Sequence, residues 1–189
     1  MRQRVLLPLL LFAVGCAGGL HRAGENQIAV HGTYGDPFRD SPVWGIGKGT
    51  ASNAGLTVGY HRFFHDRAAG VVAVTPLRVF NQDGSDIYAF EWQLGLRGFP
   101  FEFSTGSVPT ALYLEVLGGR LIADEPVPPA GTRDNWTQSF GAGLEWGFTE
   151  RTGGFLGYRL RHISNGTGNV RGNPAQNEHQ LVAGIAFRW

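Results

Sequence analysis

The feature that most restricts the fold of this chain is a repeated alternation of apolar residues with small or polar ones. It is clearest in four stretches, 88–97, 112–116, 136–148 and 180–189, where nearly every second residue is apolar. Successive side chains of a β-strand point to opposite faces, so a period of two residues is typical of strands. The pattern therefore predicts strands with one apolar face and one face of small or polar residues.

Further segments extend this pattern along the chain. Weaker alternation occurs near 27–35, 55–64, 68–80 and 153–163. These four segments raise the expected number of strands to about eight. The register of 68–80 stays open, because its alternation is poor. The expected connections differ in length, with long polar stretches at 36–54, 120–134 and 164–177 and a short one at 149–152. Long and short connections of this kind are typical of outer-membrane barrels, whose external loops are longer than their periplasmic turns.

A closed barrel is the only way in which such strands could span a membrane. After the leader, no stretch approaches the ~18 consecutive apolar residues that a transmembrane helix needs. Strands in lipid must pair every backbone group, so they close into barrels. We therefore predict an all-β fold, an eight-stranded antiparallel transmembrane β-barrel of the outer membrane. The competing interpretation is a soluble lipocalin-like barrel, which would not need an apolar row such as Trp136, Phe140, Trp146 and Phe148 on its outer face.

The first residues resemble an export signal. Two arginines precede an apolar stretch at 5–14, and small residues surround Cys16. We expect a signal peptide over about 1–20 and a single barrel domain over 25–189. Cys16 is the only cysteine, which excludes an internal disulfide framework. The sequence leaves open whether Cys16 is removed with the leader or acylated.

The charged residues indicate a filled barrel and exclude several classes of function. The formal net charge is only +1, so no nucleic-acid partner is expected. His31, His61, His65 and His179 show no metal-ligand spacing, and no phosphate-binding loop or dinucleotide motif is present. We expect no cofactor and no metal. Charges of both signs lie on the non-apolar faces and are expected to pair across a lumen too narrow for a pore: Glu91, Arg97, Glu115, Glu145, Arg159 and Arg161.

One strand end holds two residues that could perform chemistry. His162 and Ser164 share the parity of Leu156, Tyr158 and Leu160, the face expected to contact lipid. The two Cα atoms lie roughly 6–7 Å apart on a strand, so the imidazole could reach the hydroxyl. A histidine that activates a serine is the usual arrangement for acyl transfer. On spacing alone, a histidine and a serine at a strand end are more often interfacial and loop-capping residues.

The surrounding motif is more specific. It runs RHISNG from Arg161 to Gly166, and Asn173 and Pro174 follow before a final strand that ends in aromatic residues. This region, 161–188, resembles the lipid A 3-O-deacylase family of PagL-like outer-membrane enzymes. The resemblance implies that His162 is the general base and Ser164 the nucleophile. It also implies that Asn173 contributes to the oxyanion hole.

The residue that orients the histidine departs from the family pattern. A glutamate is expected four residues after the oxyanion asparagine, where this chain has Asn177, with Glu178 beside it. Parity favours Asn177, which shares the lipid-facing side with His162, whereas Glu178 would point into the lumen. An asparagine carbonyl can hold the imidazole tautomer but supplies no charge. Asn165 and Gly166 are either oxyanion donors or an ordinary turn pair.

The sequence therefore predicts a serine esterase that hydrolyses the 3-position acyl ester of lipid A in lipopolysaccharide of the outer leaflet. Its expected partners are lipid A, outer-membrane lipid and the barrel assembly machinery, which recognises a terminal aromatic signal such as Phe187-Arg188-Trp189. The oligomeric state stays open, with a homodimer as one arrangement. Two alternatives remain: a non-enzymatic small barrel that serves adhesion or envelope integrity, and a phospholipase or acyltransferase on a similar barrel.

Overall fold

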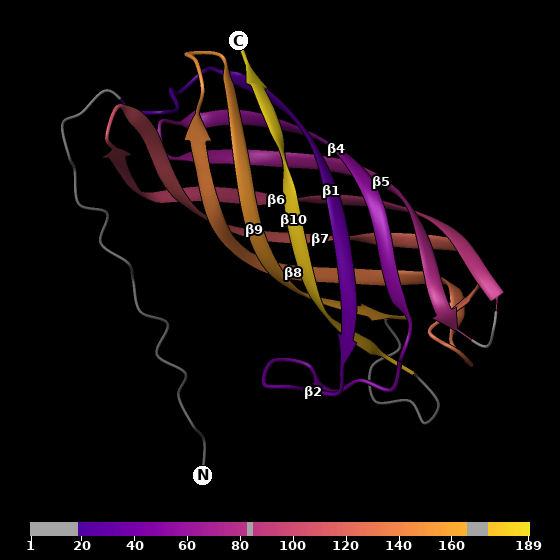
Figure 1. Ribbon diagram of the computed structural model, residues 1–189. Helices are drawn as coiled ribbons and strands as arrows, with labels where there is room; N and C mark the ends of the chain where they lie inside the picture. The colour runs from indigo at the N-terminus through magenta and orange to yellow at the C-terminus, as the bar shows by residue number, and fades with distance from the viewer. Residues whose placement is uncertain (1–18, 83–84, 166–173) are drawn as a thin grey trace.

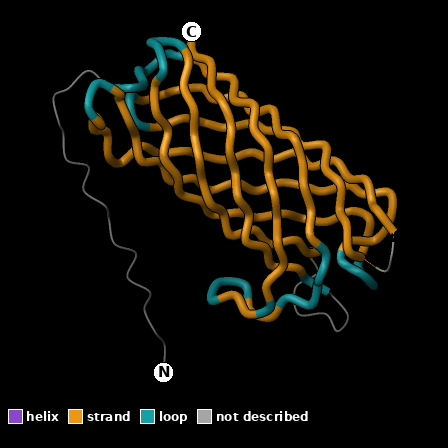
Figure 2. Tube along the Cα trace, viewed as in Figure 1, coloured by secondary structure: helices purple, strands orange, loops and turns teal. Residues whose placement is uncertain are grey.

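The computed structural model is a closed antiparallel β-barrel, and it describes residues 19–82, 85–165 and 174–189. Eight strands pair in the order β1-β10-β9-β8-β7-β6-β5-β4 (Figures 1 and 2). Two short strands, β2 (Asp40–Ser41) and β3 (Gly45–Ile46), form a separate hairpin. The barrel strands are β1 (Asn26–Phe38), β4 (Ser52–His65), β5 (Ala68–Gln82), β6 (Ser85–Thr105), β7 (Val108–Val127), β8 (Thr132–Gly147), β9 (Thr152–Ser164) and β10 (Gln176–Arg188). The predicted fold class is confirmed, while the expected signal peptide lies mostly outside the described residues.

The long polar connection expected at 120–134 is wrong. β7 continues to Val127 and β8 begins at Thr132, so most of this stretch is paired strand. Within it Leu121 is buried and Ile122 is 52% exposed, so the two-residue alternation persists. Polar residues such as Arg133 and Asp134 lie on the part of β8 that extends past its last pairing with β9, Trp136 with Ser164.

The segment whose register was open is resolved by its neighbours. In β5, Val71 and Ala73 are buried, whereas Val72 is 49% and Val74 is 37% exposed. Pairing with β4 and β6 on either side decides which residues face inward. Small and apolar residues occupy both faces here, so composition alone could not distinguish them.

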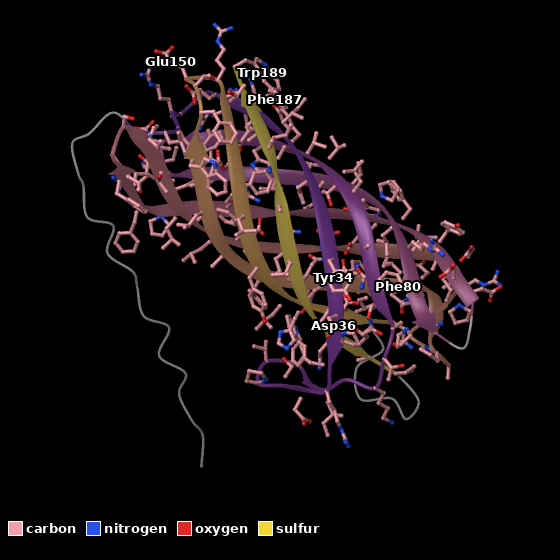
Figure 3. All side chains as sticks on the ribbon, in the orientation of Figure 1. Tyr34, Asp36, Phe80, Glu150, Phe187 and Trp189 are labelled. Atoms are coloured by element: carbon pink, nitrogen blue, oxygen red, sulfur yellow. The ribbon has the colours of Figure 1, made fainter. Side chains whose placement is uncertain are left out.

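The outer wall of the barrel is apolar, as a membrane-spanning barrel requires. Large apolar side chains such as Leu94, Leu144 and Leu156 are 51%, 42% and 56% exposed. Aromatic side chains lie at both ends, with Tyr34 near the end of β1 and Trp189 at the opposite end (Figure 3). A soluble lipocalin-like barrel would bury these residues, so that alternative is wrong. The protein is a small β-barrel of the bacterial outer membrane.

Within the described residues, no helix has the length and apolar character needed to cross a membrane. The two longest stretches of sequence between barrel strands are 39–51 and 165–175, and the strand ends that flank them lie opposite to the strand ends joined by the turns 66–67 and 106–107. We call the end with the long connections the external end. β9 therefore runs outward and ends there at Ser164.

Ion pairs fill the lumen, as the sequence indicated. Glu115 accepts hydrogen bonds from Arg97 at 2.9 Å and from Arg159 at 2.5 Å. Arg161 donates to Glu91 at 2.8 Å and to Glu178 at 2.6 Å. All six of these side chains are buried, so each charge depends on its partners for stabilisation.

The opposite end of the lumen is closed by the segment before β1. The His21 ring stacks on Phe63 at a centroid distance of 4.7 Å and packs against Phe99 at 4.0 Å. Its Nε2 lies 3.1 Å from Glu145, and its Nδ1 lies 3.4 Å from Glu102. Burial lowers the pKa of His21, but the hydrogen bonds with Glu102 and Glu145 outweigh it, so the pKa is raised. The segment before β1 therefore packs into the periplasmic end of the lumen through His21, whose raised pKa favours the protonated ring.

Candidate functional site

The two candidate catalytic residues lie on the outer wall of the barrel at its external end. His162 and Ser164 are both half-buried, and they share the outward face of β9 with Leu156 and Tyr158. The residues between them point inward, since Arg161 and Ile163 are buried. β9 therefore presents an imidazole and a hydroxyl at the edge of the lipid-facing surface.

Asn177 fixes the orientation of the His162 ring. It lies opposite His162 in the β9–β10 pairing, and its Oδ1 is 2.8 Å from the histidine Nδ1. The Nδ2 of Asn177 donates to the carbonyl oxygen of Gly45 at 2.9 Å and to that of Arg39 at 3.3 Å. Carbonyls only accept, so Nδ2 and Oδ1 cannot exchange places, and Oδ1 must accept from Nδ1–H. His162 is then protonated at Nδ1, with the lone pair at Nε2.

Glu178 lies on the other side of the wall. It is fully buried in the lumen, where it accepts hydrogen bonds from Arg161 at 2.6 Å and from Asn53 at 2.7 Å. Its charge is therefore paired inside the barrel. Of the two candidates for orienting His162, the structure brings only Asn177 to the histidine.

The first external loop covers this site, which the sequence analysis did not anticipate. Trp44, between β2 and β3, stacks on the His162 ring at a centroid distance of 5.2 Å and an interplanar angle of 14°. Its Nε1 donates to Gln138 Oε1 at 3.0 Å, and its ring also stacks on Phe140. Figure 1 shows β2 and its loop at the external end, beside the barrel wall. A lone tryptophan in a loop rich in Gly, Pro and Ser was the available signal.

Ser164 lies on the same strand face as His162 but is not hydrogen-bonded to it. Among the described residues, no hydrogen bond joins its hydroxyl to His162. Because Nδ1 is bonded to Asn177, the nitrogen available to the serine is Nε2. Catalytic hydrogen bonds are often long in a free enzyme and shorten when substrate binds.

The expected oxyanion residues are only partly visible. Asn165 follows directly after the end of β9. Gly166 and Asn173 lie outside the described residues. In the part of the chain that the structure describes, no group of three or more His, Cys, Asp or Glu residues could hold a metal ion.

Comparisons with known proteins identify the fold and no closer relationship. No model of a protein family matches the sequence, and no curated protein matches it. The crystal structure of Neisserial surface protein A is similar with a TM-score of 0.51 at 15% identity, covering 87% of this chain and 98% of the other. The outer membrane protein AlkL, solved in lipid bilayers, has a TM-score of 0.50 at 14% identity and covers 95% of each chain. What these proteins share with this chain is the fold of a small outer-membrane β-barrel.

Proposed function

We propose that this barrel is a serine esterase that removes an acyl chain from a lipid of the outer leaflet, with Ser164 as nucleophile and His162 as general base. The observation that supports this most directly is the hydrogen bond from His162 Nδ1–H to Asn177 Oδ1. It gives Nε2 the lone pair that a general base needs, on the same strand face as a serine.

The proposed reaction has two steps. His162 Nε2 takes the hydroxyl proton while Ser164 Oγ attacks the ester carbonyl, and the protonated imidazole then returns the proton to the departing alcohol oxygen. Water, deprotonated by the same nitrogen, releases the fatty acid from the acyl-enzyme. Asn173 would stabilise the oxyanion, by resemblance to the deacylase family, together with Asn165 and Gly166. No metal or cofactor is needed for this chemistry.

The substrate follows from the position of the pair and from the resemblance. Both side chains are at the external edge of the lipid-facing wall, where the outer leaflet is lipopolysaccharide. The motif at 161–166 resembles lipid A 3-O-deacylases. We therefore assign the ester at the 3-position of lipid A, with a hydroxy fatty acid as the released product.

Mass spectrometry of lipid A tests the proposal. Cells that express the wild-type chain should contain lipid A lighter by one hydroxyacyl group, and cells that express Ser164→Ala should contain intact lipid A. Equal amounts of folded barrel, judged by the heat-dependent shift in gel mobility, are required for both. Intact lipid A in the wild-type cells would refute deacylation.

A non-enzymatic barrel is the second candidate, because Trp44 covers His162 and no described hydrogen bond joins Ser164 to it. In that case Ser164→Ala would change nothing in the lipids. A phospholipase or acyltransferase would instead act on labelled phospholipid vesicles added to the purified barrel. The Ser164→Ala variant and the two substrates, lipid A and phospholipid, together separate the three functions.

Asn177→Ala should lower the rate of acyl release about tenfold, the effect of losing one hydrogen bond worth ~1.4 kcal/mol. The imidazole would then populate both tautomers and rotate. Single-turnover kinetics on lipid A in detergent measures the rate. Gln138→Ala removes the hydrogen-bond acceptor of Trp44 Nε1 in the loop that covers the site. Because Gln138 does not bond the His162 nitrogens, this substitution should have a smaller effect. An unchanged rate in Asn177→Ala would show that Asn177 does not orient the base.

A further inference from the structure

A second feature of the external end has no role in the proposed chemistry. A cavity of about 460 Å³ lies between the end of β1 and the segment that includes and follows β3. Its lining includes two apolar side chains, Phe38 and Ile46, and two cations, Arg39 and Lys48. Volumes of this order are typical of small-molecule binding sites.

Arg39 and Lys48 have no acidic ion-pair partner in the part of the chain that the structure describes. Both are exposed, and among the described residues neither has an ion pair or a side-chain hydrogen bond. The acidic neighbours in sequence, Asp36 and Asp40, do not line the cavity. The other arginines described near this end are each paired with an acid: Arg78 with Asp86, Arg120 with Asp134 and Arg133 with Glu125. The cavity therefore collects positive charge that its surroundings leave available to an anion.

The apolar members of the lining lie beside the outer wall of the barrel at its external end. Phe38 stacks on the outward-facing His179 at a centroid distance of 4.1 Å, and Ile46 is 60% exposed. An anion held here would thus have apolar surface beside it. That combination suits the phosphorylated headgroup of a lipid better than a free anion in water.

The cavity adjoins the candidate catalytic residues. The carbonyl oxygen of Arg39 accepts the hydrogen bond from Asn177 Nδ2, and Asn177 in turn bonds His162. Gly47, which also lines the cavity, packs so closely that a Cβ there would lie 2.9 Å from the backbone nitrogen of Asn177. A ligand in the cavity is therefore separated from the His162 ring by a single side chain and the loop backbone.

We propose that Arg39 and Lys48 bind a phosphate of an acylated, phosphorylated glucosamine headgroup and thereby position its ester at Ser164. Arginine and lysine both bind phosphate, arginine with two parallel hydrogen bonds and lysine as a point charge. In lipid A a phosphate and an acyl ester occupy the same sugar ring, so one molecule can reach both places. The choice of lipid A as the source rests on the proposed function, while recognition of phosphate does not.

Binding measured without turnover tests this site. The full barrel with Ser164→Ala, in detergent micelles, is titrated with bisphosphorylated lipid A, with lipid A whose phosphates have been removed, and with phosphatidylglycerol. We expect the phosphorylated form to bind about tenfold more tightly than the phosphate-free form. Adding Arg39→Ala and Lys48→Ala should abolish that preference, and higher salt should weaken it. Adding Arg133→Ala, which removes an external cation outside the cavity, should preserve it.

Each other outcome has a definite meaning. A phosphate preference that survives the double substitution in a folded barrel would overturn the site. Phosphatidylglycerol binding as tightly as lipid A would overturn the headgroup assignment, since any anionic lipid would then suffice. If the phosphate preference is present but lipid A in wild-type cells stays intact, the proposed function fails and the binding site stands.

Discussion

Replacing His162 with alanine should lower the rate of acyl release from lipid A by roughly a thousandfold or more, because the serine hydroxyl would have no base to accept its proton. The loss should appear in the chemical step, since neither Arg39 nor Lys48 is changed. Single-turnover release of the hydroxy fatty acid from lipid A measures it directly. The folded barrel itself should persist, because His162 lies on the outer wall rather than in the charged lumen.

His179→Ala is a matched control for this experiment. His179 also points outward, lies two residues beyond Asn177 on β10, and hydrogen-bonds the Tyr158 hydroxyl rather than Asn177. Its removal takes the same side chain from the same wall together with the stacking partner of Phe38, so any effect should fall on substrate binding, and the chemical step at saturating lipid A should stay close to that of the wild type. Equal losses in the two variants would mean that the histidines support the wall rather than the chemistry, and would contradict the role of His162.

Replacing Arg161 with alanine should destabilise the barrel by about 3–5 kcal/mol, because two buried carboxylates would lose their shared counter-charge. Arg161 donates to Glu91 at 2.8 Å and to Glu178 at 2.6 Å, and all three side chains are buried. Urea unfolding of the barrel in lipid vesicles, followed by tryptophan fluorescence, measures the free energy of unfolding.

Two companion variants test the cause of that loss. Arg133→Ala removes an arginine whose ion pair with Glu125 is exposed, so its effect should be small. Adding Glu91→Gln and Glu178→Gln to Arg161→Ala should restore part of the stability, because neutral amides are less costly to bury than unpaired charges. No recovery in the triple variant would show that packing of the Arg161 side chain, rather than its charge, stabilises the lumen.

Much of the fold could be predicted from the period of two. Alternation placed Leu94 and Leu156 on the lipid-facing wall and Glu115 and Arg161 in the lumen, and the structure has them there. The same parity placed Asn177 on the side of His162 and Glu178 on the side of the lumen. The catalytic roles of these residues stay predictions. Side-chain direction is a local property of an extended backbone, and so a single sequence is enough to predict it.

Local pattern failed where the length of a strand depends on its partner. The stretch 120–134 is polar enough to resemble a loop, yet β7 and β8 stay paired through most of it. Strand ends are decided by how far the neighbouring strand continues to offer hydrogen-bonding groups. Polarity does not report this for strands that extend beyond the membrane, because both faces of such strands can be polar.

The sequence by itself determined the charged lumen and the outward direction of His162 and Ser164, since both follow from alternation along a strand. It also determined the closed barrel, since strands in lipid must pair every backbone group. Only the tertiary structure decided that Trp44 covers His162, that Asn177 is held by the carbonyls of Arg39 and Gly45, and that Arg39 and Lys48 line one cavity. These contacts join residues more than 90 positions apart or depend on how a loop folds. Such a loop has no fixed period, and its conformation is selected by the surface on which it packs.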